Sequence, residues 1–424
     1  MIISKNLRGC AVNVIERFRR SFPFNWGVTT IEFGAGKTQL TGKIVKAMKA
    51  KRVLVITDPV MLKTGIINSI MEPLKKEKID SIIFSEVEPN PLDQIVEKGA
   101  AIARAEKAGI IIGLGGGSSI DTAKAVSMLA ANPGSIRDYQ IKEPFDFEKI
   151  KNHPIPLIAV PTTSGTGTEG NFWSIITNTE NWSKMAIGGA PVFPGAPCIA
   201  AKVAINDPLL TISLPAFQTA STGVDAFAHH YDAYTANLSN PISDALSEYS
   251  INLIQNYLPI AYANGKDLEA REMMMLASLL GGISFANSDC SGVHCLAEAL
   301  GGMYGNPPKP VIAHGLACSI FLPWMMEFNS MTDPVKHGNV ARLLGENTGE
   351  LPLTDRALKC VDGLKRLIRS VELPRSLESL GVKEGDLPAV AERATWNVSV
   401  ESNPRVLTYD VFLSILKKAF KGWD

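Results

Sequence analysis

The chain has 424 residues, of which 46% are hydrophobic and 20% are charged, and its 42 basic residues balance its 42 acidic ones. A zero net charge argues against nucleic acid or an anionic membrane as a partner, because both are bound through basic surfaces. No apolar run reaches the roughly 18 residues of a membrane-spanning helix. None of the six cysteines forms a CxxC pair, so we expect a protein of the reducing cytoplasm.

The first half of the chain alternates short apolar runs, rich in β-branched residues, with helical segments. The predicted strands are Thr29–Phe33, Arg52–Thr57, Ser81–Phe84, Gly109–Leu114, Ile155–Val160 and Cys198–Ile205, with a hairpin of Trp173–Thr177 and Met185–Ile187. The predicted helices are Lys43–Lys49, Leu62–Lys76, Leu92–Ala108 and Ser118–Ala131. This alternation predicts βαβ units and a mainly parallel sheet that helices cover on both faces.

The second half of the chain is predicted to be helical almost throughout. The predicted helices are Ala216–Thr235, Pro241–Ala263, Leu268–Ala286, Val293–Gly301, Leu316–Phe328, Pro334–Leu344, Asp355–Ser370 and Thr408–Phe420. We therefore predict two domains, an α/β domain over residues 1–208 and an all-helical domain over residues 209–424.

A glycine-rich loop follows the predicted strand Gly109–Leu114 and opens the next helix. Gly115, Gly116 and Gly117 let backbone amides approach an anion closely, and Ser118 stands where the helix N-terminus adds free N–H donors. The pattern favours phosphate binding, although a tight turn that binds nothing would have the same sequence.

Asp58 stands at the end of the predicted strand Arg52–Thr57, at the edge where open parallel sheets bind ligands. Its carboxylate can accept hydrogen bonds from an adenosine ribose and would repel a 2′-phosphate, which favours NAD over NADP. The alternative is an Asp that only forms the turn before Pro59.

A second polar loop, Pro161–Glu169, follows the strand Ile155–Val160. Its five hydroxyl groups and two glycines offer donors to a phosphate or a ribose. A solvated turn is the alternative interpretation.

Asp225 and His229 are four residues apart in the predicted helix Ala216–Thr235. Their side chains therefore leave one face of the helix about one turn apart. A carboxylate and an imidazole are ligands of first-row divalent metals, and His294 and His314 would complete a set of four. An Asp four residues before a His is also common by chance.

Four motifs occur in the order and roughly the spacing of the iron-containing (group III) alcohol dehydrogenases, and on them the chain resembles that family. They are Gly115-Gly116-Gly117-Ser118-x-x-Asp121-x-x-Lys124, Pro161-Thr162-Thr163-x-Gly165-Thr166-Gly167-x-Glu169, Gly223-x-Asp225-Ala226-x-x-His229 and His294…His314-Gly315. The resemblance extends from about Phe33 to the C-terminus and includes Ser402-Asn403-Pro404-Arg405.

The resemblance implies an N-terminal dinucleotide-binding α/β domain joined to an all-helical metal-binding domain, in the architecture shared with dehydroquinate synthase. It implies that Fe(II), or sometimes zinc, is bound by Asp225, His229, His294 and His314. The cofactor-binding residues that it implies, with NAD favoured over NADP, are Asp58, Gly115, Gly116, Gly117, Ser118, Asp121, Thr162, Thr163, Thr166 and Lys184. Relatives are often dimers or larger, so a homo-oligomer is expected.

Glu298 is a departure from the family pattern, because many members carry a His at this position, four residues after the ligand matched by His294. A carboxylate there can still relay a proton, and it disfavours an anionic substrate group nearby. Glu298 is therefore a candidate catalytic residue. The alternative is an acceptor that steadies His294.

Three further histidines lie outside the proposed ligand set, and three aromatic residues are candidates for a substrate pocket. His230 is interpreted as a structural neighbour of the metal site, and His153 and His337 as surface residues. An apolar substrate pocket could include Phe172, Trp173 and Phe285.

The function implied is that of an NAD(P)-linked alcohol dehydrogenase or aldehyde reductase. Hydride would pass between a metal-bound alkoxide and nicotinamide C4, and the partner would be a small alcohol or aldehyde that the sequence does not specify. The alternatives are a hydroxyacid–oxoacid transhydrogenase that retains its cofactor, and a nucleotide-binding protein whose metal site is vestigial.

Overall fold

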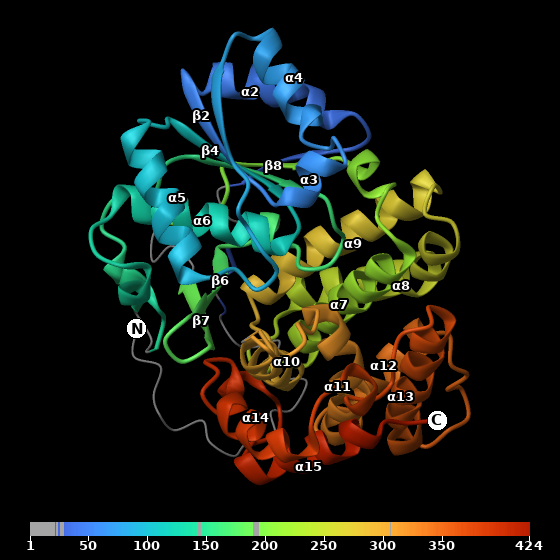
Figure 1. Ribbon diagram of the computed structural model, residues 1–424. Helices are drawn as coiled ribbons and strands as arrows, with labels where there is room; N and C mark the ends of the chain where they lie inside the picture. Colours follow the sequence, from blue (N-terminus) through green and yellow to red (C-terminus); the bar gives the residue numbers. More distant parts are fainter. Residues whose placement is uncertain (1–21, 23, 26–28, 143–145, 190–194, 306) are drawn as a thin grey trace.

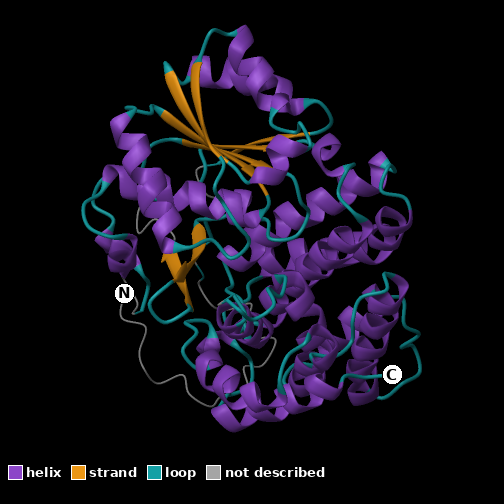
Figure 2. Cartoon of the chain, in the orientation of Figure 1, coloured by secondary structure: helices purple, strands orange, loops and turns teal. Residues whose placement is uncertain are grey.

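The computed structural model describes residues 22, 24–25, 29–142, 146–189, 195–305 and 307–424 (Figure 1). The first half of the chain forms a parallel sheet with helices around it, and the second half is helical and lies on one side of that sheet (Figure 2). The predicted fold class is thereby confirmed. The exact domain boundary at residue 208 stays a prediction.

The sheet has six strands, and every neighbouring pair is parallel. Across the sheet they are β1 (Thr30–Phe33), β8 (Val203–Asn206), β5 (Leu157–Pro161), β4 (Ile110–Gly115), β2 (Arg52–Ile56) and β3 (Asp80–Phe84). After β2 the chain crosses to β3 on one side, whereas after β4 it crosses to β5 on the other. The change of direction falls between β2 and β4, and such a point is where open parallel sheets bind their ligands.

Helices cover both faces of the sheet because its central strands are apolar on both sides. In β2, Leu54 and Ile56 belong to the buried cluster on one face, and Val53 and Val55 to the cluster on the other. The helices of the first cluster are α5 (Asp93–Ala105) and α6 (Gly117–Ala131), and those of the second are α2 (Thr41–Ala47) and α4 (Asn68–Lys76).

The predicted hairpin is confirmed as two antiparallel strands, β6 (Trp173–Asn178) and β7 (Ser183–Gly188). Ile176 and Met185 of the hairpin are fully buried in the cluster that contains α6. The hairpin therefore extends from the α6 side of the sheet toward the helical half of the chain (Figure 1).

The helical half packs around one large apolar core. Its helices are α7 (Ala216–Thr235), α8 (Pro241–Ala263), α9 (Leu268–Ala286), α10 (Gly292–Met303), α11 (His314–Asn329), α12 (Pro334–Leu343), α13 (Leu353–Ser370), α14 (Leu387–Ala394) and α15 (Tyr409–Lys421). Among the described residues, no helix combines the length and the apolar character that crossing a membrane requires.

Three local expectations were wrong. The predicted helix Leu62–Lys76 is two helices, α3 (Pro59–Lys63) and α4, because the chain turns at Gly65 with φ 75°. The predicted strand Cys198–Ile205 pairs only from Val203 onward, and α14 was not predicted.

Candidate nucleotide and metal site

Asp58 lies beside the glycine loop at the point between β2 and β4 where the sheet changes direction. A Cβ built on Gly115, whose φ is 141°, would lie 3.0 Å from Asp58 Oδ2 and 2.5 Å from Ser119 Oγ. Asp58 Oδ1 also accepts hydrogen bonds from the amides of Val60 and Met61 and caps α3. Asp58 Oδ1 therefore caps a helix, and Oδ2 faces the loop and accepts from Ser119 Oγ at 3.3 Å. The role of Asp58 toward a ribose stays a prediction.

The two loops predicted to bind the cofactor touch each other. A Cβ on Gly117 would lie 2.7 Å from Thr166 Cγ2, and one on Gly116 would lie 3.5 Å from Thr163 Oγ1. Glycine at these positions lets the second loop pack directly against the N-terminus of α6. The first N–H groups of a helix are the donors that an anion binds. Ser118 is the second residue of that helix, and Thr162 is buried where β5 ends.

The second loop also joins the sheet to the helical half. A Cβ on Gly165 would lie 2.9 Å from Thr222 Cβ on α7, and one on Gly167 only 2.1 Å from the Ser278 carbonyl oxygen on α9. The Gly167 amide donates to Ser278 Oγ at 3.2 Å. The loop therefore has one side toward the nucleotide loop and the other against the two helices.

Asp121 and Lys124 hold this second loop against α6. Asp121 accepts from the Thr168 hydroxyl at 2.5 Å and from the Ile175 amide at 3.0 Å. Lys124 Nζ is fully buried and donates to the Thr168 carbonyl at 2.6 Å and to the Trp173 carbonyl at 2.7 Å. Burial lowers the pKa of Lys124 to about 8. Both Asp121 oxygens are already engaged within the protein, so its effect on a cofactor is that of a residue that positions the loop.

Lys184 on β7 faces the helical half from the hairpin. Its Nζ donates to Asn90 Oδ1 at 2.7 Å and to Thr177 Oγ1 at 3.0 Å. Burial lowers the pKa of Lys184 to about 8, while the charge of Glu298 on α10 opposes that shift.

Glu298 stands one helical turn after His294 on α10. Its Oε2 accepts from Asn397 Nδ2 at 2.7 Å. Burial raises the pKa of Glu298, and the charges of His294 and Lys184 act against that shift. Glu298 therefore lies near enough to both proposed binding regions to respond to their charges.

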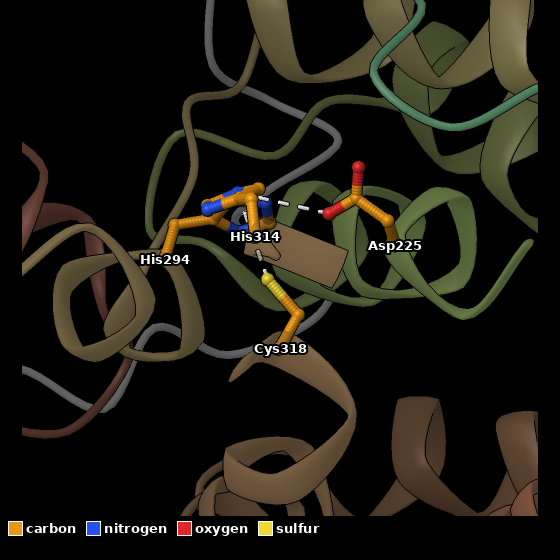
Figure 3. Close-up of side chains that lie close together, drawn as sticks. All are labelled: Asp225, His294, His314 and Cys318. Atoms are coloured by element: carbon orange, nitrogen blue, oxygen red, sulfur yellow. Dashed lines mark hydrogen bonds and ion pairs between the residues drawn. The ribbon is translucent and has the colours of Figure 1, made fainter. Parts of the chain in front are cut away.

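Asp225 and His229 lie on α7, His294 on α10, and His314 begins α11. His314 Nε2 is 3.6 Å from Asp225 Oδ1 (Figure 3). The ring centroids of His229 and His294 are 4.3 Å apart, and those of His294 and His314 are 5.5 Å apart. Asp225 and His314 are 89 residues apart in sequence (314 − 225 = 89). The fold nevertheless brings them into one cluster of side chains.

Gly315 allows the N-terminus of α11 to reach α7. A Cβ at this position would lie 2.3 Å from the Ser221 carbonyl oxygen and 2.9 Å from Asp225 Cβ. Because Gly315 has no side chain, the start of α11 can pack against α7, and His314 lies close to Asp225.

Two buried atoms at this place have no hydrogen-bond partner among the described residues. They are Asp225 Oδ1 and His294 Nε2. Leaving a buried polar atom without a partner costs about 1–3 kcal/mol, so such atoms indicate a missing binding partner. A carboxylate oxygen and an imidazole nitrogen fit a divalent cation.

Hydrogen bonds set the tautomers of two imidazoles in the cluster. His294 Nδ1 donates to Asp232 Oδ2 at 2.7 Å, and His229 Nδ1 donates to the Asp225 carbonyl oxygen at 2.9 Å. Each Nε2 then carries a lone pair, as a metal ligand must. Asp232, which is fully buried, also accepts from the Ser291 hydroxyl at 2.6 Å.

The electrostatics keep most of the cluster in its ligand form. Burial lowers the pKa of His229 well below its ordinary value and that of His314 to about 3, and His294 lowers both further. Burial lowers the pKa of His294 as well, but the hydrogen bond and charge of Asp232 outweigh it and leave that pKa raised. Burial raises the pKa of Asp225 to about 6. His229 and His314 are therefore neutral at pH 7, the form that binds metals.

The cluster contains two groups of donor atoms that meet at His294. Asp225, His294, His314 and Cys318 offer atoms within 4.8 Å of one another, and so do His229, Cys290 and His294. Sequence reasoning missed both cysteines, although Cys318 stands four residues after His314 on one helix face.

Asp232 was also missed, although it follows His229 by three residues on α7 and so shares its side of the helix. The alternative in which Glu298 steadies His294 is wrong, because Asp232 occupies the Nδ1 side of that ring.

The other expectations have mixed outcomes. His230 is structural, with Nε2 2.8 Å from the Ala277 carbonyl oxygen, and His153 is exposed. His337 is not a surface residue: it is fully buried and bonds to Tyr231 Oη at 3.1 Å. Of the three aromatic residues suggested for a pocket, Phe285 stacks on His229 with ring centroids 4.8 Å apart.

Comparison with known protein families agrees with this geometry. The family described as iron-containing alcohol dehydrogenase matches residues 28–208, and the C-terminal part of the Fe-containing alcohol dehydrogenase family matches residues 219–420. The chain belongs to the iron-containing alcohol dehydrogenase family, and it is an oxidoreductase of that type.

Individual relatives cover nearly the whole chain. It is 33% identical over 386 residues to the NAD-dependent methanol dehydrogenase of Bacillus methanolicus, and the aligned region covers 91% of this chain and 97% of that protein. It is 36% identical over 390 residues to the 1,3-propanediol dehydrogenase of Klebsiella pneumoniae, covering 92% and 96%. A solved 1,3-propanediol oxidoreductase superposes with a TM-score of 0.86 at 35% identity and covers 94% of this chain and 100% of that one.

Proposed function

We propose that this protein is a metal-dependent, NAD-linked alcohol dehydrogenase or aldehyde reductase whose ion is bound at Asp225, His229, His294 and His314. The observation that carries the proposal is the pair of buried, partnerless atoms, Asp225 Oδ1 and His294 Nε2. They lie beside the imidazoles of His229 and His314, whose pKa values are lowered. A carboxylate oxygen and imidazole nitrogens that are not protonated fit a divalent cation.

The nucleotide is proposed to bind where Asp58, the glycine loop and the second loop meet. The α6 N-terminus offers backbone N–H groups to the pyrophosphate, and Gly116 and Gly117 have no side chains to keep it from those amides. A carboxylate at Asp58 repels a 2′-phosphate, which supports NAD over NADP. Thr163 and Thr166 stand against these glycines and add hydroxyl donors.

The protein's own residues align and shield the reaction. Asp232 holds the His294 ring in one tautomer, and Phe285 covers one face of His229. The ion, when bound, supplies Lewis acidity toward an alcohol or carbonyl oxygen. Hydride is exchanged between the substrate carbon and nicotinamide, so no nucleophile of the protein is needed. Glu298 lies one turn from His294 and is proposed to carry the proton of the substrate oxygen.

The test pairs anaerobic metal analysis with a panel of alcohols and aldehydes, each with NAD and with NADP. It is run on the wild type and on His294→Ala. We expect about one divalent ion per chain and NAD-linked turnover in the wild type, and loss of most of both in the variant, because the substitution removes a ligand.

His337→Ala is the matched control, since it also removes a buried imidazole but lies outside the cluster. The His337→Ala variant should bind about as much metal as the wild type, even if its free energy of unfolding is lower. Unchanged metal content and turnover in His294→Ala would overturn the proposal. Turnover of paired substrates without added NAD would favour a transhydrogenase instead.

A further inference from the structure

Cys318 places a sulfur atom beside the proposed metal position. It lies one turn after His314 on α11, is fully buried, and its Sγ is 3.6 Å from His314 Nε2. In Figure 3 its side chain points toward the His314 ring. The thiol is also close enough to hydrogen-bond with the Asp225 carboxylate and lower its pKa.

The spacing of these atoms matches that of ligands around one ion. Zinc binds imidazole nitrogen at about 2.0–2.1 Å and sulfur at about 2.3 Å, so two such ligands at a tetrahedral angle lie about 3.6 Å apart. The distance from Cys318 Sγ to His314 Nε2 is 3.6 Å, and that from His314 Nε2 to Asp225 Oδ1 is also 3.6 Å. Asp225, His294, His314 and Cys318 are the group of four whose donor atoms all lie within 4.8 Å.

We propose that Cys318 is a further ligand of the metal ion in this protein, adding a thiolate to Asp225, His229, His294 and His314. The proposal rests on the metal site of the proposed function, and two partnerless buried atoms in the same group, Asp225 Oδ1 and His294 Nε2, point to the same ion. Binding transfers the thiol proton to solvent, because a coordinating thiol is deprotonated by the ion. His229 belongs to the second group of donor atoms, which shares His294 with the first.

A sulfur ligand has a consequence for metal choice. Thiolate is a soft ligand that favours zinc, whereas a site of carboxylate and imidazole also suits Fe(II). The wild type should therefore retain zinc over iron when both are supplied, and removing the sulfur should shift that preference toward iron.

The first experiment replaces the ion with Co(II) and records the absorption spectrum, because thiolate bound to cobalt gives a near-ultraviolet charge-transfer band that nitrogen and oxygen ligands do not. Wild type, Cys318→Ser and Cys360→Ser are compared. Cys360 is the matched control, since it is an equally buried cysteine on α13 outside the cluster. We expect the band in wild type and Cys360→Ser, and its loss in Cys318→Ser.

The second experiment needs no variant and holds if Cys318→Ser fails to fold. X-ray absorption of the zinc-loaded wild type should show a sulfur neighbour at about 2.3 Å. Bound metal with no sulfur neighbour, or a cobalt band that persists in Cys318→Ser, overturns the role of Cys318 and leaves the metal site standing. A wild type that binds neither cobalt nor zinc overturns the proposed function as well.

Discussion

At the scale of single residues, Asp232 determines the orientation and the tautomer of the His294 ring. Its carboxylate accepts from His294 Nδ1 at 2.7 Å and from the amide and hydroxyl of Ser291, so it links the ring to the start of α10. Partners of this kind fix ring orientation and raise the basicity of the ligand nitrogen. Asp232 is therefore a positioning residue for His294, and it would act on the proposed metal ion only through the imidazole.

We predict that Asp232→Asn weakens metal binding about 10–100-fold, the range usual for such partners, because the amide lacks the charge that stabilises the Nδ1–H tautomer. Titration with Zn²⁺ against a competing chelator measures the change. Asp289→Asn is the control, because the Asp289 carboxylate accepts from the Ser399 and Ser402 hydroxyls and from the Cys290 amide. Equal metal affinity in wild type and Asp232→Asn would refute the positioning role.

At the scale of elements, the site depends on how closely α11 approaches α7. The carbonyl of Ser221 leaves no room for a side chain at Gly315. His314 is the first residue of α11, so the position of that helix end sets the distance from His314 to Asp225. The geometry of the proposed metal site is thus set by helix packing as well as by the side chains of the site.

We predict that Gly315→Ala costs about 1–3 kcal/mol of stability, as overpacking usually does, and also lowers metal affinity because α11 must move away from Asp225. Chemical denaturation and Zn²⁺ titration measure the two effects. In Gly338→Ala, another helical glycine, the new Cβ would come no closer than 3.4 Å to a neighbour. That control should bind metal normally. Normal metal binding by Gly315→Ala would show that the approach of the helices is not needed.

At the scale of the whole molecule, the second loop connects the proposed nucleotide-binding region with the helical half of the chain. Its Thr163 and Thr166 stand against the glycine loop, and its Gly165 and Gly167 stand against α7 and α9. The second loop therefore lies between the proposed nucleotide site and the helices of the proposed metal site, and contacts both. A nucleotide that spans the sheet edge and reaches the metal would draw the two halves together, as in other enzymes that close over a cofactor.

We predict that NADH slows amide hydrogen exchange in the glycine loop and at the start of α10 more than in α13, which is remote from both. Exchange with mass spectrometry, with and without NADH, tests this on the metal-loaded protein. AMP serves as the control ligand, because it lacks the nicotinamide and should protect only the glycine loop. Equal protection of α10 and α13 by NADH would count against closure.

The sequence by itself was enough to predict the four proposed metal ligands, the two loops and the elements that carry them. The spacing of Asp225 and His229 on one helix, and the glycines between a strand and a helix, are local patterns. They depend on the fixed repeat of helices and strands, so they can be read without coordinates. The order of strands, the break at Gly65 and the burial of His337 could not be read in this way, since each depends on residues distant in the chain.

The tertiary structure alone decided which neighbours serve the metal residues. Asp232 rather than Glu298 holds His294, and the sulfur of Cys318 faces the same space as Asp225 Oδ1. Both facts follow from the approach of α7, α10 and α11, which brings side chains from three separate segments within a few ångströms. Contacts between helices depend on packing at small residues such as Gly315, and no repeat along the chain records them.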